Sequence, residues 1–119
     1  MNSGCIVVTG AAGGIGAASA RALGSAGRRL LLSDLNGEAL AGTARTLEAE
    51  GIAATPLAGD VTEIGHREAL AAEVERVGGL AGLAHTAGLS GTMADARRVL
   101  EVNLVATALL LERLLPLAG

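Results

Sequence analysis

The chain has 119 residues, half of them hydrophobic and none of them Phe, Trp or Tyr, and it carries a formal net charge of −3. This length suits a single domain, and without aromatic side chains there is no platform on which nucleic-acid bases could stack. The nine basic residues, all Arg, are outnumbered by twelve acids. The chain therefore lacks the positive surface that binding to nucleic acid or to an anionic membrane requires.

The chain opens without a basic-then-apolar leader, and its longest apolar run, residues 104–111, is too short to span a bilayer. We therefore expect a cytoplasmic protein. The single cysteine, Cys5, cannot form an internal disulfide, and we expect it to be a buried apolar residue.

The first predicted element is a strand over residues 5–9, followed by a glycine-dense turn and a helix over residues 14–26. The free N–H groups and the dipole of a helix N-terminus favour an anion, so this turn could hold a pyrophosphate. Gly10, Gly14 and Gly16 would supply the turn, the bare backbone facing the phosphates and the close packing of helix against strand. The alternative is a glycine-rich turn without a ligand, because a chain with 18 Gly produces such spacings by chance.

Periodicity along this first helix predicts which of its residues face the sheet. Gly27 is placed to end the helix. The predicted inner face consists of Ile15, Ser19, Ala22, Leu23 and Ala26.

A largely apolar run over residues 28–34 predicts a second strand, of the kind that a parallel sheet buries on both faces. It ends at Asp34, about 20 residues beyond the glycine turn, the offset at which a dinucleotide fold places an acid on the adenosine ribose. The carboxylate would repel a 2′-phosphate, and no Arg or Lys follows at once to receive one, so NAD is favoured over NADP. The alternative is that Asp34 caps the next helix.

A helix is predicted over residues 36–50, with Leu40 and Leu47 facing inward. The third strand, over residues 52–58, is weakened by Pro56, which suits the edge of a sheet. Both elements continue the alternation of strand and helix that is typical of a parallel sheet.

Asp60 and Val61 follow the third strand, where the carboxylate could accept a hydrogen bond from an adenine amino group while the valine packs on the ring. As plain structure, Asp60 or Thr62 would be the N-cap of a helix over residues 63–77, and both roles can hold together. His66 lies in the first turn of that helix, where we expect a surface histidine.

The fourth predicted strand covers residues 80–85. Thr86, Ala87 and Gly88 follow it, and their small size would leave room for a flat ring at the carboxyl end of the sheet. His85, the last residue of the strand, is the one candidate for an acid–base group near this crevice. Its alternative role is that of an ordinary strand-end histidine.

A final helix is predicted over residues 93–115. Asn103 lies in its middle, where asparagine has poor helix propensity. The alternative to a functional role is a surface asparagine or a core asparagine with its hydrogen bonds satisfied. The apolar stripe of this helix consists of Leu100, Leu104, Ala108, Leu111 and Leu115.

Four strands alternating with four helices predict a three-layer α/β fold. Right-handed crossovers place its four parallel strands in the order 3-2-1-4. This is half of a doubly wound, Rossmann-like sheet, with its crevice between the first and fourth strands. The glycine turn and the residues after the other three strands all fall on that one rim, so residues 1–119 would form one NAD(P)-binding domain.

Several motifs, in the right order and covering almost the whole chain, resemble the amino-terminal half of the short-chain dehydrogenases/reductases. The resemblance implies an NAD(P)-dependent oxidoreductase that acts on a small alcohol or carbonyl compound. The matching motifs are Thr9-Gly10-x-x-x-Gly14-x-Gly16, Asp34, Asp60-Val61, Ala87-Gly88 and Val102-Asn103.

The resemblance also implies roles at the glycine turn, where Gly10, Gly14, Ile15 and Gly16 would hold the cofactor pyrophosphate. Thr9 opens the same motif.

Farther along the chain, the resemblance assigns the adenosine ribose to Asp34 and the adenine to Asp60 and Val61. Ala87 and Gly88 would line the ribose on the nicotinamide side.

Asn103 would be the catalytic-helix asparagine, which in the family helps to position a water in a proton relay. The sequence departs from the family pattern in two ways. Thr86 stands where the family has an asparagine that braces the central strand, and the chain has no Tyr and no Lys to serve as the family's proton donor and its partner. We therefore expect the 119 residues alone to bind cofactor without turnover, as a domain truncated before the Tyr/Lys segment.

Two further classes of function stay open. One is a non-catalytic NAD-binding module that acts with a partner chain, since a fourth strand without a neighbour is a template for pairing. The other is a methyltransferase, because that fold also uses a glycine turn and an acid after the second strand. The resemblance also leaves a homo-oligomer open, because in the family the long helix around Asn103 often packs in a dimer bundle.

Overall fold

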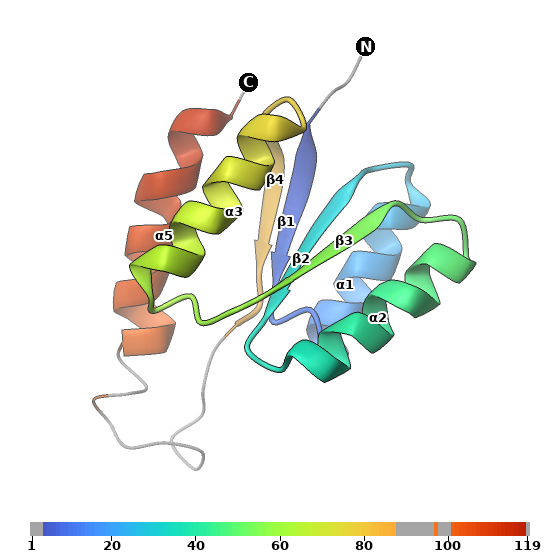
Figure 1. Cartoon of the computed structure of the whole chain (residues 1–119), viewed down its shortest axis with the longest axis horizontal. Helices are drawn as coiled ribbons and strands as arrows, with labels where there is room; N and C mark the ends of the chain where they lie inside the picture. The colour runs from blue at the N-terminus through green and yellow to red at the C-terminus, as the bar shows by residue number, and fades with distance from the viewer. Residues whose placement is uncertain (1–3, 88–96, 98–100, 119) are drawn as a thin grey trace.

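The computed structural model describes residues 4–87, 97 and 101–118. Strands and helices alternate along the chain as far as β4, and Figure 1 shows them as a sheet with helices on both sides. The elements in chain order are β1 (Cys5–Thr9), α1 (Gly14–Ser25), β2 (Leu30–Asp34), α2 (Gly37–Ala49), β3 (Ala54–Ala58), α3 (Ile64–Arg76), β4 (Leu80–His85), the π-helix η1 (Glu101–Val105), α5 (Ala106–Leu114) and the 3₁₀-helix η2 (Leu115–Leu117).

The strands are parallel and lie in the order β3-β2-β1-β4. This confirms the predicted α/β fold and its strand order. β1 and β4 have the predicted bounds, whereas β2 and β3 begin later than predicted. α1 and α2 cover one face of the sheet and α3 and α5 the other (Figure 1), which gives the three layers of half a doubly wound sheet.

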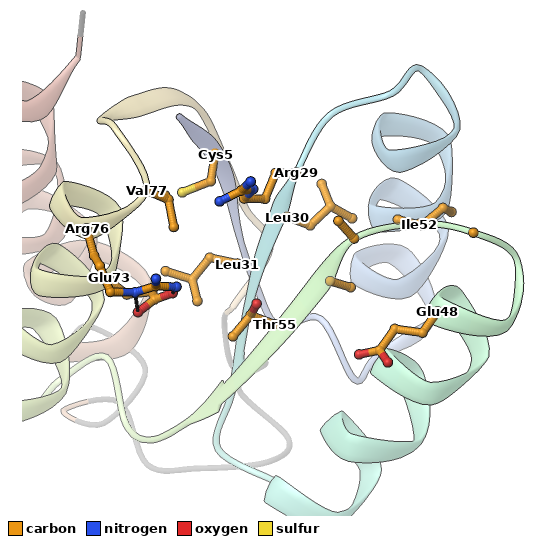
Figure 2. Close-up of a pocket in the computed structure, with 13 residues that line it drawn as sticks. Cys5, Arg29, Leu30, Leu31, Glu48, Ile52, Thr55, Glu73, Arg76 and Val77 are labelled. Carbon is orange, nitrogen blue, oxygen red and sulfur yellow. Dashed lines mark hydrogen bonds and ion pairs between the residues drawn. The ribbon is translucent and has the colours of Figure 1, made fainter. Parts of the chain in front are cut away.

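The hydrophobic core has two parts, one on each face of the sheet, because alternate residues of a strand point to opposite faces. On the side of α3 and α5, Val7 and Leu31 pack with Leu70 and Leu110. Figure 2 shows Cys5 on this side, and its residue surface is only 2% exposed. Burial raises the pKa of the Cys5 thiol, so the predicted buried, apolar role is confirmed.

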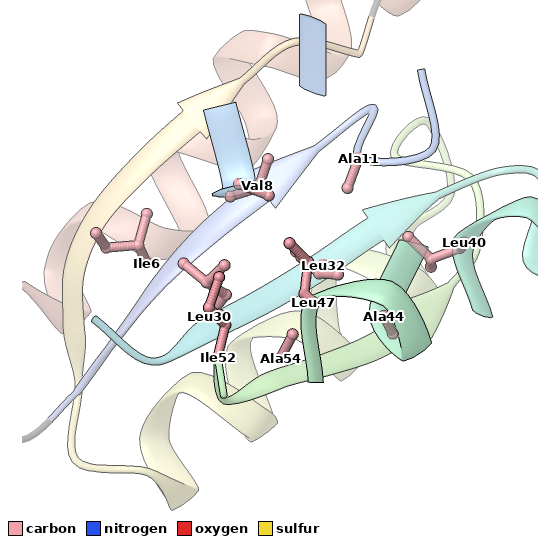
Figure 3. Packing of buried hydrophobic residues seen from close by; sticks show 11 residues of the cluster. Ile6, Val8, Ala11, Leu30, Leu32, Leu40, Ala44, Leu47, Ile52 and Ala54 are labelled. Atoms are coloured by element: carbon pink, nitrogen blue, oxygen red, sulfur yellow. The ribbon is translucent and has the colours of Figure 1, made fainter. Parts of the chain in front are cut away.

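On the side of α1 and α2, Ile6 and Val8 of β1 pack with Leu32 of β2 (Figure 3). Leu40 and Leu47 of α2 join this cluster, as their spacing predicts. The core is built entirely from aliphatic side chains and one cysteine, as a chain without aromatic residues requires.

The sheet-facing side of α1 is made mainly of the smallest residues and differs in part from the predicted one, of which Leu23 does pack against the core. Gly16, Ala20 and Gly24 are buried, whereas Ile15 is 78% exposed. A Cβ on Gly24 would lie 2.4 Å from Cγ2 of Ile52, so the helix lies too close to its neighbours for a branched side chain. A search for apolar periodicity locates large apolar side chains, whereas α1 contacts the sheet through residues that have almost no side chain.

β3 forms one edge of the sheet, as Pro56 predicts. Main-chain bonds to β2 flank the strand: Ala53 accepts from the N–H of Leu30 at 2.9 Å, and Gly59 donates to the carbonyl of Asp34 at 3.0 Å. Pro56 lies out of phase with both Ala53 and Gly59 along the strand. Its missing donor therefore falls on the outer side of the sheet.

The last helical segment is irregular. It contains the π-helix over Glu101–Val105 and then α5. Of the helix predicted over residues 93–115, residues 93–96 and 98–100 lie outside the described residues, and Leu100 is among them.

The helical segment from η1 through α5 to η2 is apolar on two sides, and the side that faces the sheet is not the predicted one. Ala106, Leu110 and Leu114 are buried, whereas Leu104 is 63% exposed and Leu115 58% exposed. With apolar residues on both sides, periodicity alone cannot tell which side meets the chain's own sheet. None of the helices in the described part of the chain has the length and apolar character that a membrane-spanning segment needs.

Candidate functional site

The glycine turn lies at the carboxyl end of β1, against the segment that follows β4. Gly10 has φ +64°, and a Cβ on it would lie 2.7 Å from the Thr86 hydroxyl and 2.8 Å from the Ala87 nitrogen. A Cβ on Gly16 would lie 1.9 Å from the Gly10 carbonyl oxygen. Only glycine fits at these two positions, so the turn and the close helix contact predicted for them are both present.

The N-terminus of α1 is bare. Its N-cap, Gly13, has no side chain to bond the first-turn N–H groups, and a Cβ on Gly14 would meet nothing within 4 Å. Gly14 and Ile15 are exposed. The first N–H groups of a helix have no intrahelical acceptor and carry its positive dipole, so this open end fits a phosphate group.

Asp34 holds the glycine turn in place. Its Oδ2 accepts from the N–H of Ala12 at 3.0 Å, and its Oδ1 accepts from the N–H of Asn36 at 2.9 Å. The N-cap of α2 is Asn36, whose side chain accepts from the N–H of Ala39. The structure therefore joins two of the predicted site elements directly, and the alternative in which Asp34 caps α2 is wrong.

The loop after β3 lies beside Asp34 through the Gly59 N–H described above. Asp60 Oδ1 accepts from both the N–H and the hydroxyl of Thr62, at 2.9 and 2.7 Å. The N-cap of α3 is Glu63, without a side-chain bond, so neither Asp60 nor Thr62 caps the helix as predicted. Val61 is only 6% exposed, which leaves little of its side chain at the surface of the loop.

His66 is buried, and the predicted surface position is wrong. Its Nε2 lies 2.7 Å from the Ser33 hydroxyl, next to Asp34 in the chain, and its ring occupies the place of a Gly59 side chain. Burial lowers the pKa of His66, and the nearby Asp60 charge opposes this. The sequence did not indicate this contact because Ser33 and His66 are 33 residues apart. The one related signal is the glycine at position 59, which leaves space for the His66 ring.

Arg67, the next residue, is also buried, and its Nη1 donates to the carbonyl of Val61 at 2.9 Å. The first turn of α3 thus contacts the loop after β3 at two points, with the His66 ring against Gly59 and Arg67 bonded to Val61.

The segment after β4 is bonded to the end of β1. The Thr86 N–H and hydroxyl both donate to the carbonyl of Thr9, and the N–H of Ala87 donates to the Thr9 hydroxyl at 3.2 Å. Thr86 therefore braces the central strand with its hydroxyl. Gly88, the last residue predicted for this segment, lies outside the described residues.

His85 connects this region to α5. Its Nδ1 lies 2.6 Å from the Thr9 hydroxyl and its Nε2 lies 2.8 Å from the Thr107 hydroxyl, which donates to the carbonyl of Asn103 at 3.2 Å. Burial lowers the pKa of His85. The predicted catalytic Asn103 lies in η1 and is exposed, and its main-chain carbonyl is linked to His85 through the Thr107 hydroxyl.

Two further observations concern metal ligands and cavities. The described residues contain no group of three or more His, Cys, Asp and Glu that could hold a metal ion. A cavity of about 590 Å³ lies at the opposite end of the sheet, where Figure 2 shows Arg29 and Thr55 near the paired Glu73 and Arg76. It contains none of the predicted site residues.

Comparison with known proteins gives consistent results. A family model described as short chain dehydrogenase matches residues 4–118. A 2,5-dichloro-2,5-cyclohexadiene-1,4-diol dehydrogenase of Sphingobium indicum is 38% identical over 84 residues, which are 70% of this chain and 34% of that protein. A 1-deoxy-11-beta-hydroxypentalenate dehydrogenase of Streptomyces avermitilis is 44% identical over 57 residues, 48% of this chain and 21% of that protein.

Similar solved structures include an actinorhodin polyketide ketoreductase with NADPH, at TM-score 0.86 and 33% identity, covering 95% of this chain and 46% of that one. A short chain dehydrogenase from Mycobacterium smegmatis has TM-score 0.85 and 29% identity, covering 98% and 52%. The chain thus spans about a third of the length of the curated relative that it matches over 84 residues, and about half of these solved chains.

Proposed function

Because the chain belongs to the short-chain dehydrogenase family, we propose that residues 1–119 are the cofactor-binding half of an NAD(P)-dependent oxidoreductase. The complete enzyme would transfer a hydride between the nicotinamide and the carbon of a small alcohol or carbonyl compound. The observation that carries the proposal is the bare N-terminus of α1, fixed by Asp34 on one side and by the Thr9–Thr86 contact on the other.

We propose that the pyrophosphate lies on the first-turn N–H groups of α1, at Gly14, Ile15 and Gly16, over the turn formed at Gly10. Asp34 would bind the adenosine ribose. Each carboxylate oxygen has more than one acceptor position, so the two backbone bonds that Asp34 already accepts leave capacity for a ribose hydroxyl.

NAD is the preferred cofactor in this proposal, because a 2′-phosphate would meet the negative charge of Asp34 at close range. The ketoreductase of similar structure contains NADPH, so the choice between the two cofactors is the part of the proposal that needs a direct test.

The other roles follow the loops around the rim. Asp60 and Val61 would contact the adenine, and Ala87 and Gly88 the ribose on the nicotinamide side. Asn103 would act in the complete enzyme as the asparagine of the catalytic helix. Since the chain has no Tyr and no Lys, we expect the 119 residues alone to bind cofactor without oxidising or reducing a substrate.

The test uses the fluorescence of NADH, which is easily followed because this chain has neither Trp nor Tyr. NADH and NADPH are titrated separately, with S-adenosylmethionine as a competitor that should have no effect. The critical variant is Gly14→Asp, which places a carboxylate where the phosphates would lie. The matched control is Gly14→Ser, of similar size and without charge.

Both variants should keep the wild-type fold, because a side chain at position 14 enters open space and an acid is favourable in the first turn of a helix. We expect Gly14→Asp to lose NADH binding by at least about tenfold, and Gly14→Ser to keep most of it. Equal affinity in the two variants would contradict the proposed site, and displacement of NADH by S-adenosylmethionine would favour a methyltransferase.

A second candidate function, a cofactor-binding module that works with a partner chain or a second copy, is favoured by the outer side of α5. Leu109 is exposed there, as are Leu104 in η1 before it and Leu115 in η2 after it, and such apolar surface marks an interaction site. An apolar groove of about 160 Å³ lies between the outer side of β4, from Leu80 to Leu83, and α5.

Sedimentation velocity tests this candidate. The wild-type chain should associate, and Leu104→Glu and Leu115→Glu should give monomers that bind NADH with unchanged affinity. A monomeric wild-type chain would remove the support for self-association.

A further inference from the structure

His85 lies between the cofactor-binding end of β1 and the helix that carries Asn103. One series of hydrogen bonds runs from the N–H of Ala87 to the Thr9 hydroxyl, from there to His85 Nδ1, from His85 Nε2 to the Thr107 hydroxyl, and on to the Asn103 carbonyl. We call its central part, Thr9–His85–Thr107, the histidine bridge.

The direction of these hydrogen bonds follows from counting protons. The Thr107 hydroxyl has one proton, and it donates that proton to the Asn103 carbonyl. It must therefore accept from His85, so Nε2 carries a hydrogen and Nδ1 in the neutral ring accepts from the Thr9 hydroxyl. The Thr9 oxygen is then free to accept from the N–H of Ala87, as it does. In the neutral ring each group thus donates once, and all the bonds run in the same direction.

The histidine bridge gives the start of α5 a directional contact with the sheet, which its apolar packing does not provide. Ala106, Leu110 and Leu114 attach the helix to the sheet by apolar contact, which is not directional. Near the other end of the helix, the partly exposed Arg113 donates to Glu68 of α3 at 2.6 Å. A hydrogen bond from His85 to Thr107, one residue into α5, fixes a single point of the helix.

The bridge also meets the helix where its backbone is least regular. Asn103 lies in the π-helix η1, a wider turn that is frequent at functional sites. The Thr107 hydroxyl bonds the Asn103 carbonyl across the junction between η1 and α5. The position of Asn103 is therefore tied to His85 through one side chain.

We propose that His85 is a positioning residue that fixes α5, and with it Asn103, relative to the end of β1 and the N–H of Ala87. The part of this inference that concerns cofactor rests on the proposed function, because Thr9 and Ala87 belong to the proposed nicotinamide side of the site. The part that concerns α5 is independent of any ligand.

The experiment uses variants that keep one half of the bridge each. His85→Gln places an amide N–H near the position of Nε2 and keeps the donor to Thr107. His85→Asn places a carbonyl oxygen near the position of Nδ1 and keeps only the acceptor for Thr9. Thr107→Ser and Thr107→Val form the matched pair at the other end, with and without the hydroxyl.

Hydrogen exchange of the α5 amides, Ala106–Leu114, is the first measurement. We expect exchange about fivefold faster in His85→Asn and Thr107→Val than in His85→Gln and Thr107→Ser, which corresponds to the loss of one ordinary hydrogen bond. Equal exchange rates in His85→Asn and His85→Gln, and in Thr107→Val and Thr107→Ser, would overturn the proposal. If His85 only filled space, it would not matter whether the replacement side chain can still donate to Thr107.

The second measurement needs no variant and is therefore immune to folding defects. The ¹⁵N chemical shifts of the wild-type His85 ring should show a protonated Nε2 and a bare Nδ1. The opposite tautomer would overturn the proposal, because Thr107 could then not donate to Asn103 while bonding the ring.

Cofactor binding separates this inference from the proposed function. On addition of nicotinamide mononucleotide the His85 ring signals should shift, and on addition of AMP they should stay in place. A chain that binds neither NADH nor the mononucleotide, yet shows the expected tautomer and exchange pattern, refutes the proposed function and upholds the bridge. A chain that binds NADH but lacks the exchange pattern refutes the bridge alone.

Discussion

The hydroxyl of Thr86 donates a hydrogen bond to the main-chain carbonyl of Thr9, the same oxygen that accepts from the Thr86 N–H at 3.2 Å. β1 and β4 are thereby joined one residue beyond the last pair of their ladder, Thr9 and His85. A side chain shorter than asparagine can do this because the carbonyl that it braces lies next to its own backbone.

Replacing Thr86 by Val should lower the free energy of unfolding by about 1 kcal/mol relative to Thr86→Ser, because Val keeps the shape and loses the hydrogen bond. Urea unfolding followed by far-ultraviolet circular dichroism measures this, as the chain has no aromatic probe. A valine variant as stable as the serine variant would show that the hydroxyl does not brace the strand.

Two glycines of the same turn should respond in opposite ways to alanine. Gly16→Ala brings a methyl group to 1.9 Å from the Gly10 carbonyl, and we expect it to destabilise the fold by about 3 kcal/mol. Gly14→Ala enters open space and should leave stability unchanged or raise it by about 0.5 kcal/mol, by restricting the unfolded chain. The same urea titrations test both, and equal losses would mean that the turn can relax around the Gly16 contact.

Stability should fall as the pH is lowered through the histidine range. Burial holds the pKa values of His66 and His85 below their ordinary value of 6.5, so below that pH the unfolded chain takes up protons that the folded chain does not. The contribution of these two histidines to the free energy of unfolding is complete above pH 6.5 and is lost progressively as the pH falls below it. Glu68 and Glu73, whose pKa values are lowered from 4.5 by hydrogen bonds from Arg side chains, act only in a more acidic range.

Unfolding free energies measured in steps between about pH 7 and pH 5 check this. The wild-type curve should decline over this interval, and the double variant His66→Gln, His85→Gln should be flatter, although less stable at neutral pH. Parallel curves for the two proteins would assign the decline to other groups.

Asp34→Asn should change the choice between cofactors. Removing the charge weakens the bond to a ribose hydroxyl and relieves the repulsion of a 2′-phosphate, so the ratio of NADH to NADPH affinity should fall by about tenfold or more. Asp60→Asn is the control, since Asp60 is proposed to contact the adenine, which both cofactors share, and its loss should affect both equally. NADH and NADPH fluorescence titrations give both ratios, and an unchanged ratio in Asp34→Asn would remove Asp34 from the ribose site.

The strands of the sheet could be predicted from the sequence because each strand is a short, largely apolar run bounded by turn residues. Leu30, Leu31 and Leu32 are buried on both faces of the sheet, as a central parallel strand requires. Right-handed crossovers reduce the orders open to four alternating units, the glycine turn after the first strand with Asp34 after the second favours the dinucleotide-binding order 3-2-1-4, and Pro56 identifies the edge.

The faces of the helices were less predictable, and for different reasons. α1 meets the sheet through Gly16 and Gly24, whose importance is their lack of a side chain, so a search for apolar bulk selects Ile15 instead. The helical segment from η1 to η2 has two apolar sides, and the side carrying Leu104 and Leu115 is mostly exposed in the described part of the chain. The periodicity of apolar residues in this segment does not indicate which of the two sides packs against the sheet.

The polar contacts of the site depend on distance in space. His66 reaches Ser33 and His85 reaches Thr107, pairs that are 33 and 22 residues apart in the chain. Neither histidine has a distinctive neighbour in sequence. The sequence placed the loops at the correct rim because strand order fixes that, and it could not give the side-chain bonds that connect them.

The two edges of the sheet are unequal. On the outer side of β3, Pro56 interrupts the row of donors, whereas in the described part of the chain the outer side of β4 is met by a strand-like bridge only at Leu80, from Ala118. A second molecule could extend the sheet beyond β4, but no further molecule would find a continuous ladder beyond β3. Stacking of this chain edge to edge should therefore stop at a closed pair, and the proline makes an endless fibre of such sheets unfavourable.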